Sequence, residues 1–235
     1  MPDRLTQDPL DQEGLNALLR AAPWRRFAVI GDSIAEGLGE EAPGYGPEPW
    51  GERIASALAA GDPAAHYVNF GRRYLRAAEI RATQLAPALA FEPDLVAVVS
   101  GGNDVLDPAF ARDALTDELE ATVAPLAATG ATVISFTLLD ITRAIPMAPE
   151  FGEHVGSRLA MLADMWREIA RRHDTVHVDL ARHPASADPR IYSVDRMHVN
   201  TRGHAVVATA TARALAEHMS TAAAPAAGSS MEAVR

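Results

Sequence analysis

Residues 27–40 read FAVIGDSIAEGLGE, and this stretch decides the fold. The apolar run that opens it stops at Gly31, and the small polar residues Asp32 and Ser33 follow immediately. A short apolar run bounded in this way is typical of a strand that is buried on both faces of a parallel sheet. Because open α/β sheets bind ligands at the carboxyl ends of their strands, the sequence predicts that Ser33 lies at a functional edge.

Four further apolar runs are similar to this first one, and segments with helical spacing separate them. The predicted strands are residues 27–31, 66–70, 95–100, 131–136 and 175–180. The predicted helices carry apolar stripes formed by Leu75, Ala78, Ala82, Leu85 and Leu89, by Leu115, Leu119, Val123 and Leu126, and by Leu159, Leu162, Trp166 and Ile169. A last helix is predicted from Thr201 to His218. The alternation of strands with helices predicts an α/β domain, a three-layer sandwich with a five-stranded parallel sheet.

The composition limits the possible classes of function. The 235 residues suffice for one α/β domain, and hydrophobic residues make up 48% of them. A formal net charge of −10 argues against nonspecific nucleic-acid binding, which requires clustered Lys and Arg. Cysteine is absent, which excludes disulfides and cysteine nucleophiles. The N-terminus lacks an apolar signal region and no run of about 20 apolar residues occurs, so we expect a cytoplasmic protein without a membrane span.

We expect one domain over residues 24–219 with peripheral segments at both ends. Residues 1–23 are predicted to form a short amphipathic arm around Leu15, Leu18 and Leu19, which Pro23 ends. Residues 220–235 are small and polar, which predicts a disordered tail.

Polar residues suited to acyl transfer follow four of the predicted strands. They are Asp32 and Ser33 after the first, Asn69 to Tyr74 after the second, Gly101 to Asp104 after the third, and Asp195 and His198 in the loop after the fifth. A serine hydroxyl becomes a nucleophile when an imidazole removes its proton, and a carboxylate on the other ring nitrogen orients that imidazole. Ser33, His198 and Asp195 supply these groups. The Ser33 amide, the Asn103 side chain and an amide after the second strand are candidate donors to an oxyanion.

Four short motifs in order along the chain strengthen this interpretation. They are GDS at 31–33, N-x-G at 69–71, GGND at 101–104 and D-x-x-H at 195–198. Together they resemble the SGNH (GDSL-type) hydrolases over roughly residues 26–218. The resemblance implies a flavodoxin-like fold, with Ser33 as nucleophile, His198 as general base and Asp195 orienting it. It also implies that Ser33 and Asn103 contribute to the oxyanion hole, and that no metal or cofactor takes part.

One position departs from the family pattern. The second motif usually runs N-x-x-x-x-G, and the amide of its last glycine donates to the oxyanion. The residue five after Asn69 is Tyr74. A tyrosine amide can still donate if Tyr74 adopts the backbone conformation that the glycine would have. Gly71 is the alternative donor if the loop is reshaped, so both hypotheses remain open.

The expected function is hydrolysis of a small-molecule carboxylic ester through an acyl-enzyme, by an esterase, lipase or deacetylase. An acyltransferase with the same three residues is the alternative, and a noncatalytic binding protein on the same fold is a further one. The sequence does not determine the oligomeric state. The connection 137–156 exceeds the ordinary length of an αβ loop, which makes it a candidate lid or acyl pocket. Met147 and Phe151 are its candidate pocket residues.

A metal site is not expected on the last predicted strand. His177 and Asp179 share one face there, with His183 beyond the strand. The third ligand would have no fixed geometry relative to the first two, so the three residues do not form a recognisable ligand set.

Overall fold

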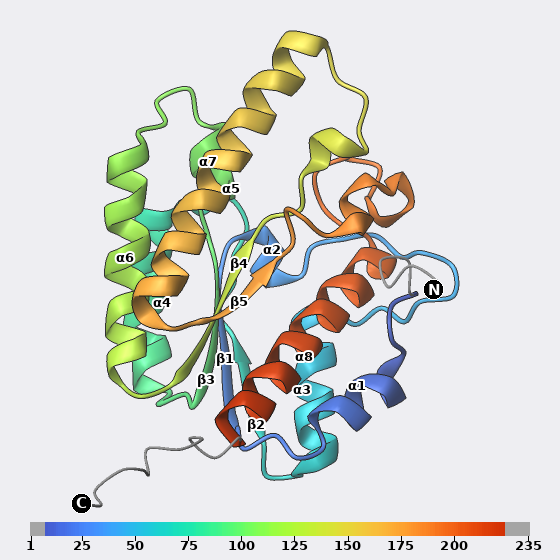
Figure 1. Ribbon diagram of the computed structural model, residues 1–235, viewed down its shortest axis with the longest axis vertical. Coiled ribbons are helices and arrows are strands. Elements are labelled where there is room, and N and C mark those ends of the chain that lie inside the picture. The colour runs from blue at the N-terminus through green and yellow to red at the C-terminus, as the bar shows by residue number, and fades with distance from the viewer. Residues whose placement is uncertain (1–7, 224–235) are drawn as a thin grey trace, which may run out of the picture.

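The computed structural model describes residues 8–223, and its centre is an all-parallel sheet (Figure 1). Five strands form this sheet in the order β2-β1-β3-β4-β5. They are β1 (Arg26–Gly31), β2 (His66–Asn69), β3 (Leu95–Val99), β4 (Thr132–Thr137) and β5 (Val176–Asp179). Each predicted strand agrees with an observed one to within one residue at both ends, which confirms the predicted fold class.

Helices cover both faces of the sheet and complete the three layers seen in Figure 1. One layer contains α1 (Gln12–Leu19), α3 (Trp50–Gly61) and α8 (Thr201–Ala223), and the other contains α4 (Ala77–Ala90), α6 (Arg112–Ala128) and α7 (Pro149–His173). The short helices are α2 (Ser33–Glu36), α5 (Gly102–Leu106), η1 (Ile141–Arg143), η2 (Pro184–Ala187) and η3 (Pro189–Ile191), the last three of 3-10 type. Among the helices in residues 8–223, none is both long enough and apolar enough to cross a membrane.

Strand β1 contributes to two cores because its side chains alternate between the two faces of the sheet. Phe27 and Val29 pack in the layer of α1, α3 and α8, whereas Ala28 and Ile30 pack in the layer of α4, α6 and α7. All four side chains are at most 1% exposed, as expected for a parallel strand that is covered on both faces. This burial fixes the strand up to Gly31, where the candidate functional residues begin.

The described part of the N-terminal arm is a helix that docks on the core. Leu15 and Leu19 of α1 are fully buried, and α1 packs against α3 and α8. Asp11 caps this helix, since its carboxylate accepts a hydrogen bond from the amide of Gly14 at 2.9 Å. At the other end, α8 continues to Ala223. The rest of the predicted arm (1–7) and of the predicted tail (224–235) lies outside the described residues.

The predicted long connection 137–156 is wrong in its second half. Helix α7 begins at Pro149, so the connection ends at Ala148 and contains η1. Proline favours the first helical position because its φ is already fixed there and its missing N–H needs no partner. The first turn of α7 is also solvent-exposed, with Phe151 58% exposed, so no apolar stripe marked it in the sequence.

Candidate active site

Ser33 is the first residue of α2 and directly follows the turn that ends β1. The Asp32 amide donates to the Val99 carbonyl oxygen at 3.3 Å. Gly31 has a φ of +149°, and a Cβ atom there would lie 2.1 Å from the same oxygen. Asp32 caps the helix, because its carboxylate accepts a hydrogen bond from the Ile34 amide at 3.0 Å. The glycine and the aspartate therefore shape the turn that presents Ser33.

Three side chains from other elements hold this turn in place. They are Gln84, whose carboxamide bonds both backbone groups of Gly31, Trp50, which donates to the Ile34 carbonyl at 2.8 Å, and Asn69, which donates to the Ala35 carbonyl at 2.8 Å. Sequence reasoning did not identify Gln84 or Trp50. The only signal for Gln84 was a polar side chain within the apolar pattern of a predicted helix.

Asp195 and His198 lie in the loop between η3 and α8. The backbone of this loop holds the Asp195 carboxylate next to the His198 ring. The Asp195 carboxylate accepts hydrogen bonds from the amides of Met197 and His198, both at 3.0 Å, and contacts His198 Nδ1 at 2.7 Å. Burial raises the pKa of Asp195, but these hydrogen bonds outweigh it and hold the pKa below its usual value. Asp195 is therefore a stable carboxylate that can orient the His198 ring.

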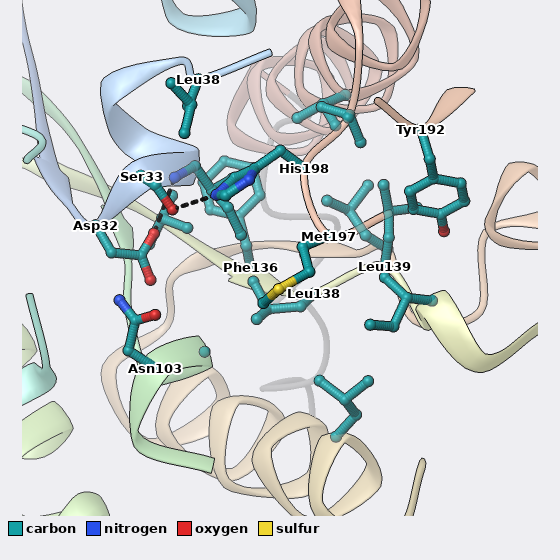
Figure 2. Close-up of a pocket in the computed structure, with 18 of the residues that line it drawn as sticks. Asp32, Ser33, Leu38, Asn103, Phe136, Leu138, Leu139, Tyr192, Met197 and His198 are labelled. Atoms are coloured by element: carbon teal, nitrogen blue, oxygen red, sulfur yellow. Dashed lines mark hydrogen bonds between the residues drawn. The ribbon is translucent and has the colours of Figure 1, made fainter. Parts of the chain in front are cut away.

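The other ring nitrogen of His198 reaches Ser33. The distance from His198 Nε2 to Ser33 Oγ is 2.7 Å, and Figure 2 shows this contact as a dashed line. With Nδ1–H donating to Asp195, Nε2 is left as the acceptor for the Ser33 hydroxyl proton. The three candidate residues thus form one continuous hydrogen-bonded chain, although 165 residues separate Ser33 from His198.

The two candidate oxyanion donors in the loop after β2, the amides of Gly71 and Tyr74, differ in whether they already have a hydrogen-bond acceptor. The Gly71 amide already donates to the Asn69 side chain at 2.8 Å. Tyr74 has a φ of +69°, which is the left-handed conformation that glycine favours, and the residue is 81% exposed. Within residues 8–223, the amides of Tyr74 and Ser33 have no hydrogen-bond acceptor. The geometry therefore favours Tyr74 over Gly71 as an available donor.

Asn103 lies at the start of α5 and lines the same cavity as Ser33, with its side chain near that of Asp32 in Figure 2. One hydrogen of its side-chain amide donates to the Leu75 carbonyl at 2.9 Å, which ties Asn103 to the loop that carries Tyr74. A carboxamide nitrogen has two hydrogens, so one remains for a ligand. Asp104, the next residue, instead accepts the amide of Ala77 at 3.0 Å and so supports the start of α4.

The buried carboxyl group of Asp32 directly precedes the candidate nucleophile, and the partly buried carboxyl group of Asp104 interacts with Asp32 electrostatically. Burial raises the pKa of Asp32 to about 6, and its side chain lines the same cavity as Ser33. Burial also raises the pKa of Asp104. The nearby negative charge of Asp104 is a smaller contribution to the shift of Asp32. Neither residue touches Ser33 Oγ in the described hydrogen bonds, so Asp32 organises the turn and does not take the place of Asp195.

The cavity that contains Ser33 has a volume of about 310 Å³, and most of its lining side chains are apolar. Met147 and Phe151 do not line it. They line a second, outer hollow of about 780 Å³, which shares Leu106, Ile141, Val155, Asp195 and Met197 with the first. The two hollows are therefore adjacent.

The residues considered for a metal site have other partners. His177 bonds Ser135 through Nδ1 at 2.9 Å, and Asp179 pairs with Arg167 at 3.0 Å. Within residues 8–223, no group of three or more His, Asp or Glu side chains is arranged to hold a metal ion.

Comparison with solved structures supports the fold. LAE5, an α/β hydrolase enzyme from the metagenome of Lake Arreo, is 24% identical with a TM-score of 0.65, over 80% of this chain and 94% of that chain. A catalytic mutant of Axe2, an acetylxylan esterase from Geobacillus stearothermophilus, is 20% identical with a TM-score of 0.64. The match covers 80% of this chain and 93% of the Axe2 chain. TesA is 23% identical with a TM-score of 0.60, and the match covers 80% of this chain and 97% of the TesA chain.

The family assignment rests on a match in sequence over most of the chain. No curated protein matches the chain. The model of the GDSL-like Lipase/Acylhydrolase family matches residues 29–206, which include Ser33, Asn103, Asp195 and His198. The chain therefore belongs to the GDSL-like lipase/acylhydrolase family and is a carboxylic ester hydrolase.

Proposed function

We propose that this hydrolase cleaves its ester through a covalent acyl-enzyme on Ser33. The observation that carries the proposal is the hydrogen-bonded chain from Ser33 Oγ through the His198 ring to Asp195, with 2.7 Å at each contact of the ring. As Oγ attacks the ester carbonyl carbon, His198 Nε2 takes the hydroxyl proton. The imidazolium then gives this proton to the leaving alcohol as the C–O bond breaks.

The second half of the cycle reverses these roles with water. Water gives a proton to His198 Nε2 while its oxygen attacks the acyl carbon. The bond to Ser33 Oγ then breaks, and Oγ takes back the proton as the acid leaves. Asp195 stabilises the imidazolium in both halves, and its lowered pKa supports this role because the carboxylate stays ionised.

The negative charge that develops on the carbonyl oxygen requires hydrogen-bond donors. We assign this task to the Ser33 amide, the Tyr74 amide and the side-chain amide of Asn103. Two observations support the assignment: both backbone amides lack acceptors within residues 8–223, and Asn103 is tied to the Tyr74 loop through Leu75. Asp32 and Gly31 support these donors indirectly by fixing the turn.

Detection of the acyl-enzyme tests the proposal. The protein is mixed with p-nitrophenyl acetate, quenched in acid, digested and analysed by mass spectrometry. We expect an acetyl group on the peptide that contains Ser33 and a burst of p-nitrophenol equal to the enzyme concentration. Acetylation of any other residue, with none on Ser33, would refute the proposal. Adding a primary alcohol as a competing acceptor, and measuring the ester formed, separates hydrolysis from acyl transfer.

A further inference from the structure

We propose that the acyl part of the substrate is an unbranched hydrocarbon chain that occupies an inner chamber behind His198. This inference rests on the proposed acyl-enzyme on Ser33. The inner chamber is the part of the Ser33 cavity lined by Phe136, Leu139, Leu180, Tyr192, Val199 and Val207. Figure 2 shows Leu139 and Tyr192 beyond His198 and Met197, on the side away from Asp32 and Asn103.

The inner chamber lies within the core of the protein. Its walls come from the ends of β4 and β5, from the loop that carries His198, and from α8. Each of its six lining residues is at most 9% exposed and belongs to the core layer of α1, α3 and α8. A group that enters from Ser33 is therefore removed from water.

The chamber offers no free polar partner to a ligand. Tyr192 is the only lining residue with a polar side-chain group, and its hydroxyl donates to the Ser186 carbonyl at 3.1 Å. A sugar hydroxyl placed there would lose its hydrogen bonds to water, which is unfavourable. A hydrocarbon chain is favoured instead, because each methylene group that leaves water increases the binding constant by up to about fourfold. The chamber therefore favours a hydrocarbon acyl chain over an acyl group that carries hydroxyls.

The surface around the cavity mouth is apolar as well. Within residues 8–223, the exposed large hydrophobic side chains are those of Tyr74, Leu106, Phe151, Val194 and Met197. Four of them line the Ser33 cavity or the outer hollow, and Val194 directly precedes Asp195. A cluster of this kind marks a site that binds an apolar ligand.

The alcohol part of the ester then leaves through the outer hollow. This hollow combines Met147 and Phe151 with the polar side chains of His154, Arg158 and Arg196. Such a mixed and open lining accepts an alcohol of varied polarity. The acyl chain and the alcohol thus occupy opposite sides of Ser33, as an ester that is cleaved at its carbonyl carbon requires.

A chain-length series tests the chamber. For the wild type, we expect kcat/KM for p-nitrophenyl octanoate to exceed that for the acetate by more than tenfold. Leu139→Phe fills the chamber, so the octanoate-to-acetate ratio should fall at least tenfold, whereas Leu139→Ala should keep the ratio or move the optimum to longer chains. Leu18→Phe, the same substitution on α1 outside both hollows, is the matched control and should leave the ratio unchanged. An unchanged ratio in Leu139→Phe would overturn the inference.

A covalent adduct gives an answer that does not depend on the folding of a variant. Wild-type protein is labelled with an octyl fluorophosphonate, and a crystal structure of the adduct is determined. An alkyl chain between Leu139 and Tyr192 supports the inference, and an alkyl chain beside Met147 and Phe151 overturns it. If the protein hydrolyses acetate but prefers it to octanoate, only this inference fails. If it hydrolyses none of the esters and the probe does not label Ser33, the proposed function fails as well.

Discussion

The Gln84 side chain binds both backbone groups of Gly31 in the way that a neighbouring strand would. Its Nε2 donates to the Gly31 carbonyl at 2.9 Å, and its Oε1 accepts from the Gly31 amide at 2.7 Å. Gln84 is 3% exposed and belongs to α4, whereas Gly31 ends β1 two residues before Ser33. The position of the candidate nucleophile therefore depends on a helix that contributes no side chain to the cavity.

Replacing Gln84 with leucine should lower both stability and turnover. The substitution leaves the buried Gly31 amide without a partner, whereas the Gly31 carbonyl still accepts a hydrogen bond from the Arg72 amide at 3.1 Å. An unsatisfied buried group costs about 1–3 kcal/mol in the free energy of unfolding. A small displacement of Ser33 should reduce kcat by roughly tenfold to a hundredfold, with KM little changed. Urea unfolding and ester kinetics measure the two effects.

The control for this substitution is Thr83→Val, the neighbouring exposed residue, whose hydroxyl bonds only within α4. Thr83→Val should leave both the free energy of unfolding and kcat close to their wild-type values. If Gln84→Leu loses stability but keeps the wild-type kcat at a temperature where it is fully folded, Gln84 supports the fold alone and does not position Ser33.

The contrast between Ser33 and Gln84 shows what could be predicted from the sequence. Strands such as β1 and β3 were predictable because burial on both faces requires uninterrupted apolar runs, and Ser33, Asn103, Asp195 and His198 each follow a strand in a recognisable motif. The role of Gln84 was not predictable, because it depends on how close helix α4 lies to the end of strand β1. The inner chamber was not predictable either, since its lining residues come from β4, from the segments after β4 and after β5, from the loop between η3 and α8, and from α8.

Ser33→Ala should abolish ester hydrolysis while the fold persists. The substitution removes only Oγ, which is bound to His198 at the surface of the cavity, and no backbone bond depends on it. Removal of a triad nucleophile costs several orders of magnitude in kcat, so the residual rate should approach the background rate. Ester kinetics and circular dichroism are the measurements. Ser56→Ala, an exposed serine on α3, is the matched control. A loss of only a few fold in Ser33→Ala would exclude Ser33 as the nucleophile.

Asp32 should make the protein less stable as pH rises from about 4 to about 6. Burial raises the pKa of Asp32 from 3.8 to about 6, so the folded state binds its proton more tightly than the unfolded state does. Between these two pH values the folded state holds more protons, and its stability falls as pH increases. Above pH 6 the charged carboxylate should cost on the order of 2–3 kcal/mol relative to the protonated form.

Asp32→Asn isolates this contribution, because its side-chain oxygen can still accept the Ile34 amide. The difference in free energy of unfolding between Asp32→Asn and the wild type should grow in favour of the variant from pH 4 to pH 6.5, as measured by urea unfolding at several pH values. Asp117→Asn, at an exposed position of α6, serves as the control for removal of a carboxylate at the surface. A constant difference for Asp32→Asn would mean that the carboxyl is not buried as described.

Tyr74 should act through its backbone amide and not through its ring. Its φ of +69° lies in the left-handed region that glycine favours, so Tyr74→Gly keeps the amide, removes the exposed ring and relieves the unfavourable left-handed backbone. Turnover of a small acetate ester should stay within about tenfold of the wild type. Thermal stability should be unchanged or slightly higher.

Deletion of the amide hydrogen alone is the sharper test. Proline is unsuitable, because it fixes φ near −65° and would reshape the loop as well as remove the N–H. Incorporating the α-hydroxy acid analogue of tyrosine at position 74 replaces the N–H by an ester oxygen and keeps the side chain. Loss of one oxyanion donor costs about a hundredfold or more in kcat, so we expect a decrease of that size with KM little affected. The same backbone replacement at Gly71, with glycolic acid, removes only the hydrogen bond to Asn69 and should be milder. A severe loss at position 71 and a mild one at position 74 would assign the oxyanion donor to Gly71 instead.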